Sequence, residues 1–212
     1  MTPEPGLRER KKARTHRAIS EAAIALFLQR GYDAVSVAEI AEAAEVSKRT
    51  LFAYFPTKDE LVVHRFADHR DESARVVRAR PAGVSPLDAL HEHLRAALAH
   101  RDPISGLCDV PGVVAFYQLV IGTPALNAAT VRYQARGEDA LAAALHEAAP
   151  AAPELGARLA AGQILGALRT LAHTNQVRIA AGRSADELAP VAAAEADLAF
   201  DQLRSGLANY RR

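Results

Sequence analysis

Cysteine, tryptophan and long apolar runs are what this sequence has least of. Its 212 residues include one cysteine, Cys108, no tryptophan and only 5% aromatic residues. A single cysteine excludes a disulfide within the chain and is typical of a reducing compartment. No apolar run approaches the ~18 residues that suggest a membrane-spanning helix, and the first residues lack the apolar segment of a secretory signal. We therefore expect a cytoplasmic protein with no membrane partner.

An excess of one charge is also missing, because 26 Lys and Arg face 25 Asp and Glu. This balance does not exclude a nucleic-acid partner, since phosphates respond to a local basic patch and not to the net charge. Residues 8–17 form such a patch, with six basic side chains and a single acidic one. The run could follow DNA phosphates or be a merely charged tail, and residues 1–7 before it are expected to be disordered.

Alanine is abundant and β-branched runs are scarce, which favours packed helices over sheets. Apolar residues at helical spacing and serine caps predict an all-α fold of about nine helices, with no strand. The first carries Ile19, Ala23 and Phe27 on one face and ends at Gly31. The others are expected at residues 36–44, 48–55, 57–80, 86–101, 113–121, 124–148, 154–181 and 185–209.

Two of these helices are short and separated by a tight turn, which is the geometry of a helix-turn-helix. The second helix of that motif lies in the major groove with its N-terminal residues on base edges. Lys48, Arg49 and Thr50 occupy those positions, after the cap Ser47. Lys and Arg donate hydrogen bonds to guanine, and Thr offers a hydroxyl and a methyl group. The motif predicts binding to double-stranded DNA.

The residues from Ala18 to Leu61 closely resemble the DNA-binding domain of the TetR family of repressors. The matching residues are Leu26-Phe27, Arg30-Gly31-Tyr32, Ser36-Val37, Ile40-Ala41, Val46-Ser47, Thr50-Leu51-Phe52, Tyr54-Phe55-Pro56, Lys58 and Leu61. The resemblance implies phosphate contacts from Ser36, Tyr54 and Lys58, and base contacts from Lys48, Arg49 and Thr50. It also implies a DNA-binding domain over 8–57, followed by a helical ligand-binding and dimerisation domain over 58–212.

Two positions depart from the family pattern. Glu45 stands in the turn where glycine is usual, so a residue with a side chain has to adopt a positive φ there. Phe52 stands where tyrosine is common, which removes a hydroxyl that could reach a phosphate. Neither change argues against DNA binding, but both prevent the transfer of a known operator sequence to this chain.

The helices after residue 58 are where we expect a small-molecule effector and a homodimer. Aromatic or polar groups on apolar stripes are the sequence signs of a pocket, although each of them is at least as compatible with ordinary packing. The candidates for a largely apolar ligand are Phe66, His91, Phe116, Tyr117, Tyr133, Gln163 and Arg169. By the resemblance, residues 158–178 and 188–207 of the last two helices form the dimer, which implies a palindromic operator.

A repressor of this kind would leave its operator when the ligand favours a dimer whose recognition helices are too far apart. The rival hypothesis is a helical enzyme or redox sensor that uses Cys108 beside a vestigial helix-turn-helix. Nothing near Cys108 in the sequence supplies a base or an oxyanion hole. The eight histidines lack the spacing of metal ligands, so we expect no enzyme, no metal and no cofactor.

Overall fold

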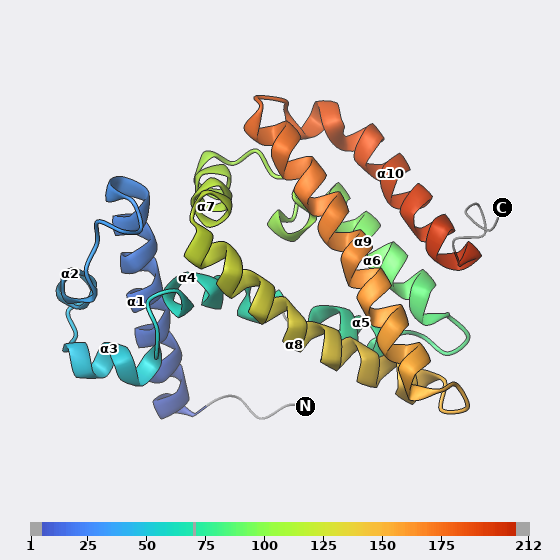
Figure 1. Cartoon of the computed structure of the whole chain (residues 1–212), viewed down its shortest axis with the longest axis horizontal. Helices are drawn as coiled ribbons and strands as arrows, with labels where there is room; N and C mark the ends of the chain where they lie inside the picture. The colour runs from blue at the N-terminus through green and yellow to red at the C-terminus, as the bar shows by residue number, and fades with distance from the viewer. Residues whose placement is uncertain (1–5, 70, 207–212) are drawn as a thin grey trace. The chain divides into compact units, whose positions relative to one another are not determined.

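The computed structural model describes residues 6–69 and 71–206, and the regular secondary structure of these residues is helical, without a strand. The all-α prediction is therefore confirmed. The elements are α1 (Leu7–Arg30), α2 (Val37–Ala43), α3 (Lys48–Tyr54), α4 (Glu60–Val63), the 3-10 helix η1 (His64–His69), α5 (Glu72–Ala79), α6 (Pro86–Ala99), the 3-10 helix η2 (Pro103–Ser105), α7 (Pro111–Gly122), α8 (Pro124–Ala148), α9 (Glu154–Ala180) and α10 (Ala185–Ser205). Figure 1 shows their order along the chain.

The chain forms two compact units, Met1–Ala67 with Ala115–Val131 and Asp68–Val114 with Arg132–Arg212. We call them the first and the second unit. The core of the first unit is built on α1, whose Ile19, Ala23 and Phe27 are buried at i, i+4 and i+8. These side chains pack with buried Leu51 in the middle of α3 and with buried Phe55, the residue that follows the helix. The stripe predicted from the sequence is thus the one that holds the first three helices together.

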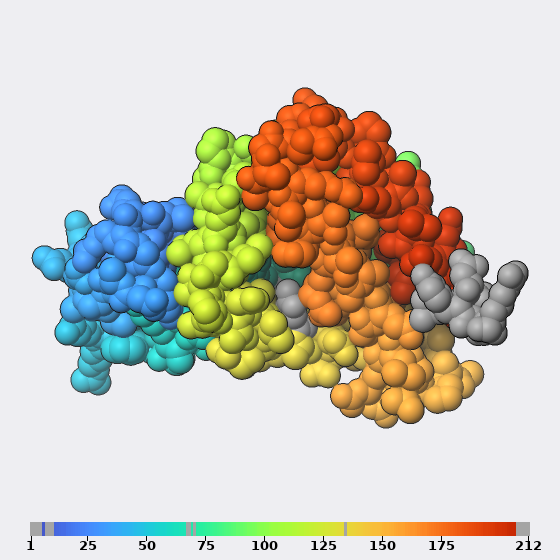
Figure 2. Space-filling view, turned by 45° about the horizontal axis from the view of Figure 1, so that its top comes forward, coloured from blue at the N-terminus to red at the C-terminus, as the bar shows by residue number. Residues whose placement is uncertain are grey.

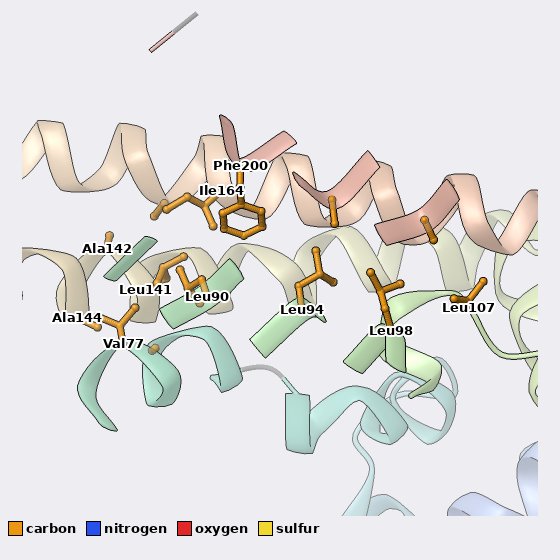
Figure 3. Close-up of a cluster of buried hydrophobic side chains, with 14 of the residues drawn as sticks. Val77, Leu90, Leu94, Leu98, Leu107, Leu141, Ala142, Ala144, Ile164 and Phe200 are labelled. Atoms are coloured by element: carbon orange, nitrogen blue, oxygen red, sulfur yellow. The ribbon is translucent and has the colours of Figure 1, made fainter. Parts of the chain in front are cut away.

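The core of the second unit lies among α5, α6, α8, α9 and α10. Phe200 of α10 is fully buried and points in among Leu90 of α6, Leu141 of α8 and Ile164 of α9 (Figure 3). Ion pairs fasten the same helices at their edges, for example the two hydrogen bonds of 2.7 Å from Arg178 of α9 to the Glu195 carboxylate of α10. The long C-terminal helices are therefore fixed by both apolar packing and charge.

The serine caps fall where the sequence placed them. Ser36, Ser47, Ser85 and Ser184 each accept a hydrogen bond from the backbone amide three residues later, at the starts of α2, α3, α6 and α10. These bonds satisfy amides that a helix start leaves without a partner. The predicted ends of these helices agree with the structure to within a few residues, up to residue 206.

Two predictions about the helices were wrong. The expected helix over 57–80 is divided into α4, η1 and α5, and no side chain caps α4. The cause is the stretch from Asp68 to Ser73, which carries no apolar residue and so has no stripe to bury. The described residues contain ten α-helices, in agreement with the about nine that the sequence predicts. The first helix also begins at Leu7, so the basic run is part of α1; of the expected disorder over 1–7, residues 1–5 lie outside the described residues.

In the part of the chain that the structure describes, no helix alone has both the length and the apolar composition to cross a membrane. On those two criteria only α7 and α8 taken together qualify, and they are bent by 96° where they meet.

Candidate nucleic-acid interface

The turn between α2 and α3 is set by Glu45. Its amide donates to Glu42 O (3.0 Å), and the next amide, of Val46, reaches back to Ala41 O (2.9 Å). This pair of bonds is the Schellman ending of a helix, which requires a left-handed residue at the position of Glu45. Glu45 has φ +54°, as expected from the sequence. The conformation turns the chain so that α3 can start three residues later at Lys48.

The start of α2 is locked to the end of α1. The Ser36 hydroxyl accepts from the Glu39 amide and the Glu39 carboxylate accepts from the Ser36 amide, which together make the predicted capping box. The same carboxylate pairs with Arg30 of α1 at 2.7 Å. These three partners lower the pKa of Glu39 to about 2, with the backbone amide of Ser36 as the largest cause. The carboxylate therefore stays charged and holds α2 in place at neutral pH.

The outer face of α3 carries the predicted base-contacting residues. Lys48 and Arg49 are exposed, and Phe52 is 48% exposed although it is a large apolar side chain. Arg49 and Phe52 are one turn apart and point away from buried Leu51. Thr50 is half-buried, and its hydroxyl bonds to that of the cap Ser47 at 2.8 Å. The structure thus brings a cationic and an aromatic group together on one open helix face, with Thr50 turned toward the cap.

The C-terminal end of α3 rests against α1 through aromatic contacts. Half-buried Tyr54 meets the ring of His16 edge-on at 5.9 Å between centroids, and buried Phe55 lies 4.1 Å from the same ring. The ring of His64, at the start of η1, lies 3.7 Å from His16 on another side. Burial, followed by the charges of His64 and Lys12, lowers the pKa of His16 to about 4. His16 is therefore neutral at physiological pH.

Lys58 lies in the turn before α4. Its ammonium donates to the Tyr32 carbonyl at 2.5 Å and sits 4.2 Å from the centroid of the Tyr32 ring. Burial lowers its pKa from the ordinary value. An ammonium has three donors, so this carbonyl leaves others for a phosphate. In the structure Lys58 joins the turn before α4 to Tyr32 within the first unit. Its contact with a phosphate stays a prediction.

The predicted ligand residues fall into both units. Phe66 of η1 lies 5.6 Å from Phe116 and 6.2 Å from Tyr117 of α7, centroid to centroid, so three of them form one aromatic cluster in the first unit. The guanidinium of Arg65 covers the Phe116 ring at 5.5 Å. The other four belong to the second unit and are His91, Tyr133, Gln163 and Arg169. Whether any of them binds a ligand stays a prediction.

The second-unit candidates are not gathered in one place. His91 of α6 stacks on Phe200 at 4.6 Å and bonds to Asp197 at 2.8 Å, so its ring is engaged with α10. Tyr133 of α8 is half-buried, whereas Gln163 and Arg169 are exposed on α9. Cys108 is buried at 7% exposure, which argues against the rival redox or nucleophilic role because such cysteines need access. In the described residues, no three His, Cys, Asp or Glu side chains are arranged to hold a metal ion.

Two contributors to the interface were missed in the sequence. His16 continues the α1 stripe at the spacing of Ser20, Ala23 and Phe27, and this periodicity was the available sign that its ring points inward. Ser20 itself is buried and its hydroxyl donates to Leu61 O at 2.7 Å, which ties α4 to α1. Both are polar groups that continue an apolar stripe and point inward with it.

Comparison with known proteins points in the same direction as this geometry. Residues 19–64 match the family model described as bacterial regulatory proteins, tetR family. The chain is 37% identical over 139 residues to the transcriptional regulator TcmR of Streptomyces glaucescens, covering 65% of this chain and 62% of TcmR. It is 33% identical over 93 residues to the regulator RutR of Escherichia coli, covering 44% of each. The chain thus spans less than two thirds of these relatives, which are regulators and not enzymes.

Solved structures with the same fold cover more of the chain. The chain is similar to NalD of Pseudomonas aeruginosa, the secondary repressor of the MexAB-OprM multidrug efflux pump, with a TM-score of 0.58, 18% identity and 88% of this chain and 96% of NalD covered. It is also similar to the repressor FadR of Thermus thermophilus, solved with lauroyl-CoA, with a TM-score of 0.53, 21% identity and 91% and 94% covered. At these identities the likeness establishes the fold alone.

Proposed function

Because residues 19–64 belong to the tetR family of bacterial regulatory proteins, we propose that the chain is a homodimeric repressor that binds a palindromic operator and leaves it on binding a small, largely apolar ligand. The observation that carries the proposal is the exposed outer face of α3, where Lys48, Arg49 and Phe52 stand clear of the core. Its site of action is the cytoplasm, where bacterial DNA lies.

In DNA recognition each of these residues has the role that its exposed chemical groups permit. Arg49 and Lys48 donate to guanine edges in the major groove, and each good bidentate contact contributes roughly 1–3 kcal/mol of discrimination. Phe52 offers an apolar surface for a thymine methyl group. Ser36, Ser47, Tyr54 and Lys58 contact the phosphates beside that groove, and these contacts fix the register without reading sequence.

The homodimer forms through α9 and α10. Leu155, Leu159 and Val177 are 53–66% exposed on α9 and fall within about 40° of one another around the helix axis. Val191 and Leu198 form a similar exposed line on α10, and the two helices make a continuous surface in Figure 2. Exposed apolar lines of this length are typical of helix–helix interfaces. A two-fold axis through them presents two copies of α3 to two half-sites.

Release by a ligand requires that the ligand bind the DNA-free state more tightly than the bound one. The aromatic cluster of Phe66, Phe116 and Tyr117 supports a ligand with an apolar body, and the acyl chain of the lauroyl-CoA in Thermus FadR has that character. His91, Tyr133, Gln163 and Arg169 remain the candidate polar handles.

Selection of DNA from a random duplex library by the purified chain tests the proposal. We expect a palindromic consensus, bound by one dimer per duplex, with an affinity that falls steeply as salt rises. Enrichment of no consensus over unselected DNA would contradict it, as would a consensus without two-fold symmetry.

A further inference from the structure

The basic run of the sequence, which the proposed function leaves without a role, is helical and continuous with α1. Among its residues whose side chains are described, Lys11, Lys12, Arg14 and Arg17 are all exposed. A helix fixes the direction of each side chain relative to the core that follows. The basic side chains of the run therefore differ in direction, and each can be assigned to a face of α1.

Lys12 lies on the face of α1 that points toward the rest of the first unit. Counting back from buried Ala23 and Ser20 by turns of 3.6 residues leads to His16 and then to Lys12 on the same side of the helix. Lys11 and Arg14 project away from this stripe by the same count. The inward stripe of α1 thus turns from apolar to cationic at its N-terminal end.

The neighbour of that cationic end is the C-terminal end of α3. His16, one turn after Lys12, contacts the rings of both Tyr54 and Phe55. The charge of Lys12 also acts on the His16 ring, where it is one of the causes that lower the pKa of His16 to about 4. Because His16 is half-buried against the rings of Tyr54 and Phe55 and is neutral, Lys12 is a cation that α1 presents on the side of Tyr54. In Figure 1 the start of α1 lies next to α3.

We infer that Lys12 binds a DNA backbone phosphate next to the one that Tyr54 contacts, so that α1 extends the DNA-binding surface beyond the helix-turn-helix. This inference rests on the proposed function. The phosphates of one strand follow one another along its backbone, so a lysine one turn before His16, on the face that meets Tyr54, can bind the phosphate next to that of Tyr54. The contact carries no sequence information, and it strengthens binding to every duplex by a similar factor.

The experiment compares Lys12→Gln with Lys11→Gln on the duplex selected by the unaltered chain. The two variants remove the same charge from adjacent residues, which lie about 100° apart around the helix axis, so that only Lys12 falls within the inward stripe. For Lys12→Gln we expect a Kd about three- to tenfold weaker and a plot of log Kd against log salt that is shallower by about one phosphate per protomer. Lys11→Gln should leave both quantities unchanged, and Lys12→Arg should restore them. Circular dichroism should show the same helical content in each variant as in the unaltered chain.

Equal losses in Lys12→Gln and Lys11→Gln would overturn the inference, because the run would then act as an undirected charge. An unchanged salt slope in Lys12→Gln would overturn it too. These results leave the proposed function intact, since the duplex is still selected and bound through α3. If no duplex is selected at all, the proposed function itself fails, and this inference fails with it.

Discussion

Replacing Glu45 by glycine should stabilise the first unit. Glu45 has φ +54° in a Schellman turn whose two backbone hydrogen bonds, to Ala41 O and Glu42 O, fix that conformation. A left-handed conformation costs an ordinary residue roughly 1–2 kcal/mol, and glycine avoids this cost. Glycine gives back roughly 0.5–1 kcal/mol through the greater freedom of its unfolded chain. The net gain should be about 0.5–1 kcal/mol.

Two measurements check this prediction in the full chain. Hydrogen exchange of the α1 amides between Ile19 and Phe27 reports the opening of the first unit's own core, and it should slow about two- to fivefold in Glu45→Gly. Urea unfolding followed by circular dichroism should give a matching change in the free energy of unfolding. Glu45→Ala is the control, because alanine removes the charge but keeps the Cβ that makes a positive φ costly.

The reasoning is refuted if Glu45→Ala stabilises as much as Glu45→Gly, since the benefit would then come from the lost charge. Arg101 offers an internal comparison. It ends α6 with φ +54° as well, but its guanidinium bonds to Leu98 O and to Asp186. Arg101→Gly loses those bonds along with the strain, and so should not stabilise the second unit.

Two further predictions concern the second unit. Glu72 bonds to His69 at 2.7 Å and to His93 at 3.0 Å, which lowers the pKa of Glu72 to about 2 and raises that of His93 above 6.5. The lowered pKa of Glu72 adds stability that is fully present above pH 4.5 and is lost as the pH falls toward 2, whereas the raised pKa of His93 adds stability that is present below pH 6.5 and is lost at higher pH. Glu72→Gln should therefore reduce the free energy of unfolding most between pH 4.5 and 6.5. A difference between variant and unaltered chain that is flat from pH 4 to 9 would contradict this. The double variant Leu159→Lys with Leu198→Lys should sediment as a monomer. The control Val110→Lys, at a site that is 56% exposed and lies outside α9 and α10, should stay dimeric. A double variant that remains a dimer would exclude these faces of α9 and α10 as the interface.

Features of the fold that depend on residues close together in the sequence could be predicted, and those that depend on distant residues could not. Caps such as Ser36 and Ser47 act on amides two or three residues away, so their positions could be predicted from the chain itself. The positive φ of Glu45 followed from the need for a tight turn between two short helices. These local rules are why the helix-turn-helix region could be predicted almost residue by residue.

Contacts between distant residues were beyond the same reasoning. Lys58 bonds to the carbonyl of Tyr32, 26 residues away, and His91 bonds to Asp197, 106 residues away. No local sequence pattern predicts either partner. The helix expected over 57–80 is divided near a polar stretch, Asp68 to Ser73, which has no apolar stripe to bury against another helix. A polar residue that interrupts an apolar stripe is therefore an uncertain sign of a ligand site, because a distant residue of the same chain can be its hydrogen-bond partner.

Binding of the selected duplex by the double variant Lys48→Ala with Arg49→Ala tests the central claim most directly. The matched control is Arg75→Ala with Arg136→Ala, which removes the same charge from exposed sites of the second unit. We predict that the α3 variant loses its preference for the selected duplex over random DNA by at least about a hundredfold, while the control keeps it and both stay folded. Retention of sequence-specific binding by a folded α3 variant would contradict the account.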